Sequence, residues 1–207
     1  MSQYFEVHPE NPQLRLIRRA VEMLRHDGAV IAYPTDSSYA LGCHLGDKRG
    51  MERIRRIRQL NDRHNFTLVC RDLSEISTYA RVNNSAYRLL KAHTPGPYTF
   101  IFKATNEVPK RLLHAKRKTI GIRVPDHPVA HALLDELQEP IMSTTLILPG
   151  AEGPEVDAHE IRERLEHEVD LVIDAGHCGY EASTVIDFVD DVPQIIRQGC
   201  GSTEGFV

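Results

Sequence analysis

The sequence contains no tryptophan, only four cysteines and no long run of apolar residues. Its longest apolar runs, such as 29–33, have the length of a strand, whereas a helix that spans a membrane needs about 20 apolar residues. The opening Met-Ser-Gln-Tyr-Phe-Glu has neither the basic nor the apolar region of a signal peptide. The cysteines lie far apart, which indicates free thiols rather than a disulfide framework. We therefore expect a cytoplasmic protein with no membrane partner.

Most standard signatures of catalysis and nucleotide binding are also absent. The sequence has no G-x-x-x-x-G-K-[ST], G-x-G-x-x-G, G-x-S-x-G or H-E-x-x-H motif, so a P-loop, a Rossmann fingerprint, a hydrolase elbow and a zinc protease have no support. His127 and His131 are four residues apart at an expected helix start, but a third ligand is missing. We interpret them as polar residues of that helix start and predict no metal site.

The composition is that of a globular protein. Hydrophobic residues make up 41% and charged residues 26% of the 207 residues, which is enough apolar content for a sizeable core. A chain of this length favours one large domain over two small ones. We therefore expect a single domain over residues 1–207.

A net charge of −4 hides an uneven distribution of charge. Residues 46–71 contain eight Lys or Arg and three Asp or Glu, whereas residues 152–191 contain two and thirteen. A second basic group consists of Lys110, Arg111, Lys116, Arg117 and Lys118. Two interpretations stay open: the basic segments share one positive surface that attracts an anionic partner, or they are solvated helix faces.

Apolar spacing predicts an alternation of helices and strands. Leu14, Ile17, Val21 and Leu24 recur at helical spacing, with Asn11 as the expected cap. Further helices are predicted at 48–58, at 85–93 with Asn84 as cap, at 128–137 started by Asp126, and at 158–166. Strands are predicted at 30–33, 66–70, 98–103, 119–124, 141–145, 171–174, 184–188 and 194–197. Helices that alternate with strands, followed by two consecutive strands, indicate an α/β domain with a mixed sheet.

Hydroxyl-bearing residues lie at the ends of several predicted strands. Thr35 and Ser37 follow one strand, Ser143 lies near the end of another, and Ser183 precedes a third. Arg123 and Arg197 lie at further strand ends. Each segment alone fits ordinary turn chemistry. Together they predict a site for a carboxylate or a phosphate, because a guanidinium group binds such anions with two parallel hydrogen bonds.

Six segments give the sequence a specific resemblance. They are Ala32-Tyr-Pro-Thr-Asp-Ser-Ser-Tyr-Ala-Leu-Gly-Cys43, Thr94-Pro-Gly-Pro-Tyr-Thr-Phe-Ile-Phe-Lys103, Ile122-Arg-Val-Pro-Asp-His-Pro128, Pro140-Ile-Met-Ser-Thr-Thr145, Glu181-Ala-Ser-Thr-Val185 and Ile195-Ile-Arg-Gln-Gly199. In this order they resemble the YrdC/YciO family, relatives of the threonylcarbamoyl-AMP synthases of tRNA modification, and most closely its YciO branch. The resemblance implies a single α/β domain in which helices flank a large twisted mixed sheet with a positively charged concave cavity.

The resemblance also implies roles for individual residues. Arg123 corresponds to an arginine that holds the carboxylate of L-threonine. The residues that correspond to the substrate pocket are Thr35, Ser37, Arg123, Ser143 and Ser183. Nucleotide is expected at Arg58, Arg63, Thr145 and Arg197. The two basic segments, rather than the resemblance, place RNA at Lys48, Arg55, Lys110, Lys116 and Arg117. No tightly bound cofactor is expected, and ATP or AMP would enter as substrate with Mg²⁺.

Two departures from the synthases accompany the resemblance. The synthases carry Lys-x-Arg where this sequence has Arg58-Gln59-Leu60, and Ser-x-Asn where it has Thr145-Leu146-Ile147. Loss of one donor to developing charge typically costs about 2.7–4 kcal/mol of transition-state stabilisation. We therefore predict a protein that binds nucleotide and double-stranded RNA or tRNA, is related to threonylcarbamoyl-adenosine modification, and has weak or lost synthase activity.

Two other functions stay open. An active enzyme would make threonylcarbamoyl-AMP from L-threonine, bicarbonate and ATP, or would hydrolyse a threonylcarbamoylated adenylate or tRNA. A scaffold protein would keep a vestigial pocket and bind a basic partner through its acidic C-terminal third.

Overall fold

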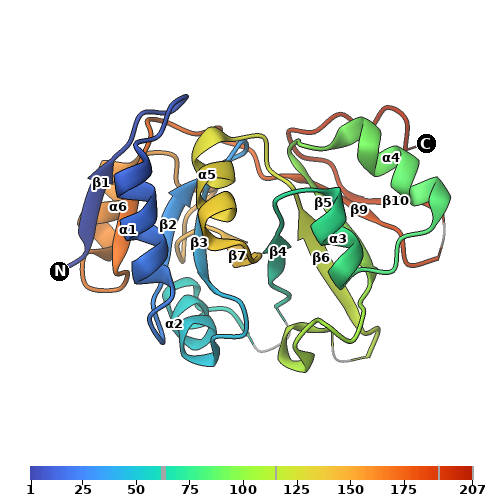
Figure 1. The fold of residues 1–207 in the computed structure, drawn as a ribbon, viewed down its shortest axis with the longest axis horizontal. Helices are drawn as coiled ribbons and strands as arrows, with labels where there is room; N and C mark the ends of the chain where they lie inside the picture. Colours follow the sequence, from blue (N-terminus) through green and yellow to red (C-terminus); the bar gives the residue numbers. More distant parts are fainter. Residues whose placement is uncertain (62–63, 115, 191, 207) are drawn as a thin grey trace.

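The computed structural model describes residues 1–61, 64–114, 116–190 and 192–206. Ten described strands form one sheet in the order β1-β8-β2-β3-β7-β4-β6-β5-β9-β10. Figure 1 shows this row of strands crossing the molecule, from β1 near the N-terminus to β10 near the C-terminus. Four neighbouring pairs are parallel and five are antiparallel. The predicted single α/β domain with a mixed sheet is confirmed.

Secondary-structure bounds follow the apolar pattern closely. The strands are β1 (Gln3–Glu6), β2 (Ile31–Pro34), β3 (Tyr39–His44), β4 (Thr67–Val69), β5 (Tyr98–Lys103), β6 (Thr119–Arg123), β7 (Ile141–Thr145), β8 (Leu171–Asp174), β9 (Thr184–Asp187) and β10 (Gln194–Arg197). The helices are α1 (Leu14–Leu24), α2 (Lys48–Arg58), α3 (Leu73–Tyr79), α4 (Asn84–His93), α5 (Pro128–Leu137) and α6 (Ala158–Leu165), with a short 3₁₀ helix η1 (Lys110–Leu112). The sequence pattern does not predict β1, β3 and α3.

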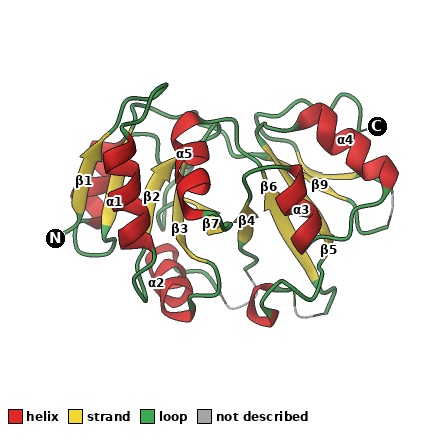
Figure 2. Ribbon diagram, in the orientation of Figure 1, coloured by secondary structure: helices red, strands yellow, loops and turns green. Residues whose placement is uncertain are grey.

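Two apolar cores lie on opposite faces of the sheet, because successive strand residues point to opposite faces. On the first face, α1 and α5 pack against Ile31, Tyr33 and Ile173. On the second face, α2, α3, α4 and α6 pack against residues such as Ala32 and Ile122. Figure 2 shows α1, α2 and α5 over one half of the strand row, and α3 and α4 over the other half.

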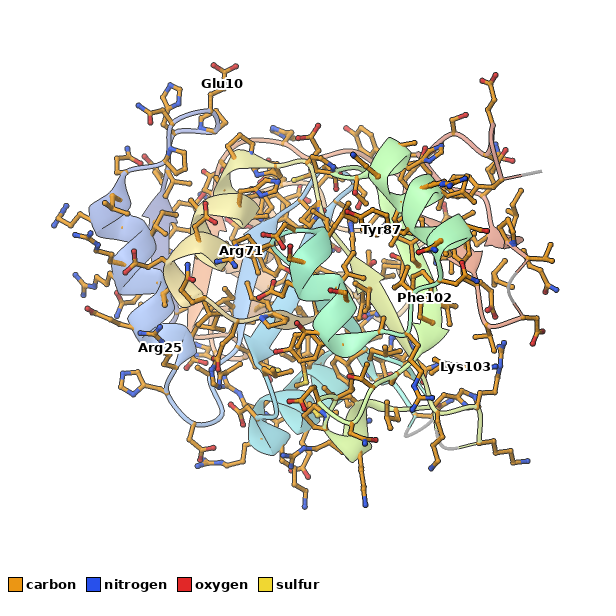
Figure 3. The ribbon with its side chains drawn as sticks, turned by 45° about the vertical axis from the view of Figure 1, so that its right-hand side comes forward. Glu10, Arg25, Arg71, Tyr87, Phe102 and Lys103 are labelled. Carbon is orange, nitrogen blue, oxygen red and sulfur yellow. The ribbon has the colours of Figure 1, made fainter. Side chains whose placement is uncertain are left out.

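The central strands carry polar residues on the first face, beyond the cover of α1 and α5. The strand register places Thr67 of β4 beside Ser143 of β7 and Gly121 of β6. In β5, Thr99 lies on this face, whereas its neighbour Phe100 is buried in the second core. The same alternation places Phe102 inside the protein and Lys103 at its surface, as Figure 3 shows. This polar strip of the sheet is where a cavity opens.

Three helix caps, those of α1, α4 and α5, differ from those predicted. α1 begins after Gln13, which makes no capping hydrogen bond, so the predicted Asn11 cap is wrong. At α4 the cap is Asn83 rather than Asn84, and its side chain accepts the N–H of Ala86. The shift of one residue keeps the same chemistry, because either asparagine can serve as an N-cap.

α5 begins after His127 rather than Asp126. The Nδ1 atom of His127 accepts the N–H of Val129, 3.2 Å away, and so replaces the predicted acidic cap. The backbone N–H of Asp126 donates instead to Oδ2 of Asp36 at 2.8 Å. This bond fixes the start of α5 against the β2–β3 hairpin.

Hydrogen bonds of Arg71 connect the segment after α5 with the start of α3. Figure 3 shows Arg71 between α3 and α5. Its Nη1 atom donates to the side chain of Gln138 at 2.8 Å, and its backbone N–H donates to Glu75 at 2.6 Å. These hydrogen bonds hold the end of α5 beside the start of α3, across the central strands.

Candidate functional site

A cavity of about 190 Å³ opens on the polar strip of the central strands. Its lining comes from β2, β3, β4, β5, β6, β7 and β10, from the end of α2 and from four connections. The lining residues are Tyr33, Thr35, Ala40, Arg58, His64, Asn65, Thr67, Val69, Thr99, Arg123, Ser143, Thr144, Thr145, Ile147, Ser183 and Arg197. Three of these are arginines, so the described lining is polar and positively charged.

The floor of the cavity is held rigidly by side-chain hydrogen bonds. Ser143 accepts the hydroxyl of Tyr33 at 2.7 Å and donates to the carbonyl of Leu41 at 3.1 Å. Complete burial raises the pKa of Tyr33 to about 12, which keeps this hydroxyl a donor. Gly121 leaves the floor open, because a Cβ there would lie 3.2 Å from Thr67 Oγ1.

One end of the cavity, here called the Arg123 end, consists of Arg123 and the hairpin residues Thr35, Asp36 and Ser37. The Nη2 atom of Arg123 donates to Ser37 Oγ at 2.8 Å, to Thr35 Oγ1 at 3.3 Å and to the Asp36 carboxylate. Only 8% of the arginine side chain and 9% of the Asp36 side chain are exposed. Within the described residues, Nε of Arg123 is buried and has no hydrogen-bond partner.

The hairpin at the Arg123 end is shaped by a local turn. Thr35 Oγ1 donates to the carbonyl of Ser38 at 2.6 Å and accepts the N–H groups of Ser37 and Ser38. Serine and threonine favour such turns because a short hydroxyl reaches the backbone two or three residues on. The hydroxyls are thereby buried but fixed toward Arg123.

Contact between the hairpin and Arg123 reveals the curvature of the sheet. β6 and the β2–β3 hairpin are separated in the strand order by β7 and β4. Three to four strand spacings of about 4.8 Å would keep them far apart in a flat sheet. They meet because twisted strands rotate steadily along the row, so that opposite strand ends approach across the concave face.

The other end, here called the Arg58 end, consists of Arg58, His64, Thr144 and Ile147. Arg58 lies in the last turn of α2, and its Nη1 atom donates to Thr144 Oγ1 at 2.6 Å. Its Nε atom donates to the carbonyl of Ile147 at 3.1 Å. The Nε2 atom of His64 lies 3.2 Å from the same Thr144 oxygen. Burial lowers the pKa of Arg58 and that of His64.

A third wall comes from the C-terminal strands. Ser183 Oγ lies 2.8 Å from Thr99 Oγ1, and the Arg197 guanidinium donates to the Ser183 carbonyl at 2.8 Å. Gly199 packs so closely on this segment that a Cβ would lie 2.1 Å from the Ala182 carbonyl oxygen. The close approach fixes Ser183 at the cavity, while Arg197 stays exposed.

Most residues predicted for substrate and nucleotide lie together in the cavity lining. They are Thr35, Arg123, Ser143, Ser183, Arg58, Thr145 and Arg197. Ser37 lies behind this surface and contacts the guanidinium of Arg123. Arg63 lies outside the described residues. The lining also contains residues outside the predicted site, namely Tyr33, His64, Thr67, Thr99 and Thr144. Tyr33 and Thr144 belong to segments that the sequence singles out, and alternation with apolar neighbours in β5 is a signal that could have found Thr99.

The residues predicted for RNA lie outside the cavity lining. Lys48 is 3.8 Å from Glu52 in an exposed pair, and Arg117 is 2.7 Å from Asp187. Arg55 instead stacks on the ring of Phe66 at 5.4 Å. Lys110 and Lys116 complete the set on the η1 segment and the turn after it.

The two basic segments approach each other. A Cβ placed on Gly46, just before α2, would lie 3.7 Å from Nη2 of Arg111. Figure 1 shows η1, coloured yellow-green, near α2 at the lower edge of the view. Several basic residues of α2 are already paired, such as Arg53 with Asp170 at 2.6 Å. The segments therefore share one end of the molecule, with part of their charge neutralised.

No group of three or more His, Cys, Asp or Glu side chains suited to a metal ion occurs within the described residues. His127 serves as a helix cap, as described above. The described helices also include none with the length and apolar character needed to cross a membrane.

The sequence model of the Sua5_yciO_yrdC family, described as Telomere recombination, matches residues 23–199. The chain belongs to this family. Among relatives within the Sua5_yciO_yrdC family, the protein YciO of Escherichia coli K12 is 60% identical over 207 residues, which cover 100% of each chain. The threonylcarbamoyl-AMP synthase of Chromobacterium violaceum is 36% identical over 138 residues, which cover 66% of this chain and 70% of that one.

Solved structures of Sua5_yciO_yrdC members share the fold. The crystal structure of E. coli YciO covers 100% of both chains with a TM-score of 0.96. P. abyssi Sua5 in complex with L-threonine is 25% identical with a TM-score of 0.87, over 96% of this chain and 58% of that one. The predicted resemblance is confirmed: the protein has the YrdC-like fold of YciO and is related more distantly to threonylcarbamoyl-AMP synthases.

Proposed function

We propose that the cavity binds a nucleotide together with a small carboxylic acid, with L-threonine as the first candidate. The observation that carries the proposal is the Arg123 guanidinium, which is buried between two hydroxyls and the Asp36 carboxylate and has an Nε atom without a described partner. A buried donor without a partner costs about 1–3 kcal/mol. A ligand carboxylate would remove that cost by accepting from Nε.

The proposal includes weak or lost synthase activity. The two positions at which the sequence departs from the synthases, Leu60 and Ile147, lie at or near the Arg58 end. Ile147 lines the cavity and offers Arg58 its carbonyl, with no side-chain amide for a phosphate. Each missing donor to developing phosphate charge is worth about 2.7–4 kcal/mol. Nucleotide binding with little turnover follows from this combination.

The test combines binding with turnover. Calorimetry with AMP and with L-threonine should detect binding of each, and Arg123→Ala should abolish the response to L-threonine. Pyrophosphate release from Mg²⁺-ATP should stay near background whether L-threonine and bicarbonate are present or omitted. Release that requires both co-substrates would support the active synthase instead. Absence of binding by both AMP and L-threonine would contradict the proposal.

RNA binding is a second candidate, favoured by the meeting of the two basic segments at Gly46 and Arg111. Phosphate contacts release counterions, so affinity for a double-stranded RNA or tRNA should fall steeply as salt increases. Lys110→Ala and Lys116→Ala should each weaken binding and reduce the salt slope by about 1. Binding that is independent of salt, or absent at low salt, would exclude this candidate.

A further inference from the structure

The Arg58 end holds a cation that has no acidic neighbour among the described residues of the cavity lining. Both acceptors of Arg58, the Thr144 hydroxyl and the Ile147 carbonyl, are neutral. Of the residues that the structure describes around the cavity, none is Asp or Glu. At the opposite end the Asp36 carboxylate already balances Arg123. A second anion position in the cavity would therefore lie beside Arg58.

His64 shares a hydroxyl with this arginine. Thr144 Oγ1 accepts from Arg58 at 2.6 Å and lies 3.2 Å from His64 Nε2. Since an arginine only donates, the hydroxyl hydrogen of Thr144 is free to point to the imidazole. In this arrangement Arg58 donates to Thr144 Oγ1, and the Thr144 hydroxyl donates to Nε2 of His64. Nε2 can accept this hydrogen bond only when the imidazole is neutral.

The surroundings of His64 keep it neutral when no ligand is bound. Burial lowers its pKa, and the positive charges of Arg58 and Arg55 lower it further. These two arginines of α2 are the charged groups that act on it within the described residues. The ring of Phe66 lies edge-on to the imidazole of His64, with 6.2 Å between the two ring centroids. An anion beside Arg58 would reverse this balance by favouring the imidazolium.

We infer that His64 takes up one proton from solvent when a tetrahedral dianion, such as a phosphate group of the ligand, binds beside Arg58. The inference rests on the proposed function, since it places the nucleotide phosphate at this end. The proton goes to Nε2, which then donates to Thr144 Oγ1. The hydroxyl hydrogen of Thr144 turns to the anion, so that arginine, threonine and imidazolium hold it together.

The uptake of a proton makes binding depend on pH and on ligand charge. Anion affinity should rise as pH falls from about 8 to about 5, the range in which histidine changes charge. The limit is about tenfold per pH unit for one proton. A dianion gains more than a carboxylate, because it favours the second positive charge more strongly.

Inorganic sulfate is the probe for this inference, because it stays a dianion through this pH range, whereas a phosphate ester has its second pKa near about 6. Sulfate affinity is measured by calorimetry at several pH values, and the imidazole signals are followed by NMR. His64→Gln should bind sulfate with an affinity that no longer depends on pH. His167→Gln, at an exposed histidine outside the cavity lining, should behave as wild type. Thr144→Val should weaken sulfate binding at every pH.

The outcomes separate the inference from the proposed function. Loss of the pH dependence in His64→Gln alone supports proton uptake by His64. Sulfate binding that ignores pH in the wild type, or that keeps its pH dependence in a folded His64→Gln, overturns it. If AMP binds but the pH dependence of sulfate affinity is the same in the wild type and in His64→Gln, the inference fails and the proposed function stands. If neither AMP nor sulfate binds, both fail.

Discussion

Each end of the cavity holds an arginine, and the two arginines differ in the charge of their hydrogen-bond acceptors. At the Arg123 end the guanidinium faces a carboxylate and two hydroxyls, and 8% of its side chain is exposed. At the Arg58 end the guanidinium is half-buried and bonds only neutral groups among the described residues. The first cation is balanced before any ligand arrives. The second has only neutral acceptors among the described residues.

Because their acceptors differ in charge, we expect Arg123 and Arg58 to have different roles. A balanced buried pair contributes to the rigidity of the site, and breaking it leaves a buried charge. A cation that has no acidic partner among the described residues, next to a neutral imidazole, gains more from an anionic ligand. Changes at the Arg123 end should therefore affect stability most, whereas changes at the Arg58 end should affect binding most.

Removal of Arg123 should have the largest effect on stability. Arg123→Ala leaves the Asp36 carboxylate buried without its cation, which should lower the free energy of unfolding by about 3–5 kcal/mol in urea denaturation. The double variant Arg123→Ala with Asp36→Asn removes both charges and should recover part of this loss. Equal stability of the single and double variants would show that the pair does not have this role.

Removal of Arg58 should instead reduce ligand affinity. Arg58→Leu deletes a charged donor worth about 1.5–3 kcal/mol to an anion, so AMP and sulfate should bind about tenfold more weakly or worse. The urea midpoint should change little, since burial already disfavours this charge. Arg56→Leu is the matched control, because Arg56 lies on the same helix, is exposed and pairs with Glu168 at 3.7 Å. A similar loss in both variants would point to a general field effect.

Neutralising Asp36 should raise the affinity of the Arg123 end for a carboxylate ligand. The Asp36 carboxylate competes with a ligand carboxylate for the Arg123 guanidinium, so Asp36→Asn should raise the affinity for L-threonine by about tenfold, or about 1.4 kcal/mol, in calorimetry. Asn keeps the size of the side chain and an acceptor for the Asp126 N–H. Weaker binding by this variant would mean that Asp36 orients Arg123 rather than competing for its ligand.

The smallest effect concerns His127, next to the hairpin. Burial lowers its pKa in the folded protein below the ordinary value. The unfolded chain therefore binds the proton first, and stability is lost as pH falls below about 6.5. His127→Asn keeps a cap acceptor at every pH. The loss in free energy of unfolding between about pH 7.5 and pH 5.5 should shrink by up to about 1 kcal/mol; an unchanged loss would place the acid sensitivity elsewhere.

Local patterns predict much of the fold. The bounds of α2, α5, β5, β7, β8 and β10 are those predicted, because their apolar residues keep one period and turn residues end the runs. β3 escapes prediction because Tyr39–Cys43 is buried on both faces and shows no alternation. β1 is short and lies at the edge of the sheet. Its four residues provide too little pattern to separate a strand from a loop.

The site is predicted in its residue types but not in its arrangement. Hydroxyls and arginines at strand ends indicate an anion site, and the family resemblance identifies seven of the sixteen lining residues. Neither source predicts that Asp36 pairs with Arg123, because that contact depends on the accumulated twist of several strands. His64 lies in a loop with no local signal, and only the fold brings it to Thr144.

The curvature that closes the cavity also makes the site a property of the whole chain. Its lining extends from Tyr33 to Arg197 in the sequence, and sheet neighbours such as β2 and β8 are more than a hundred residues apart. If only the part of the chain up to the end of α5 were folded, the cavity would contain Arg58 and Arg123 but would lack Ser143 and Ser183. Ligand occupancy therefore reports completed folding, and a bound ligand should protect distant segments from proteolysis together, by mass action on the native state.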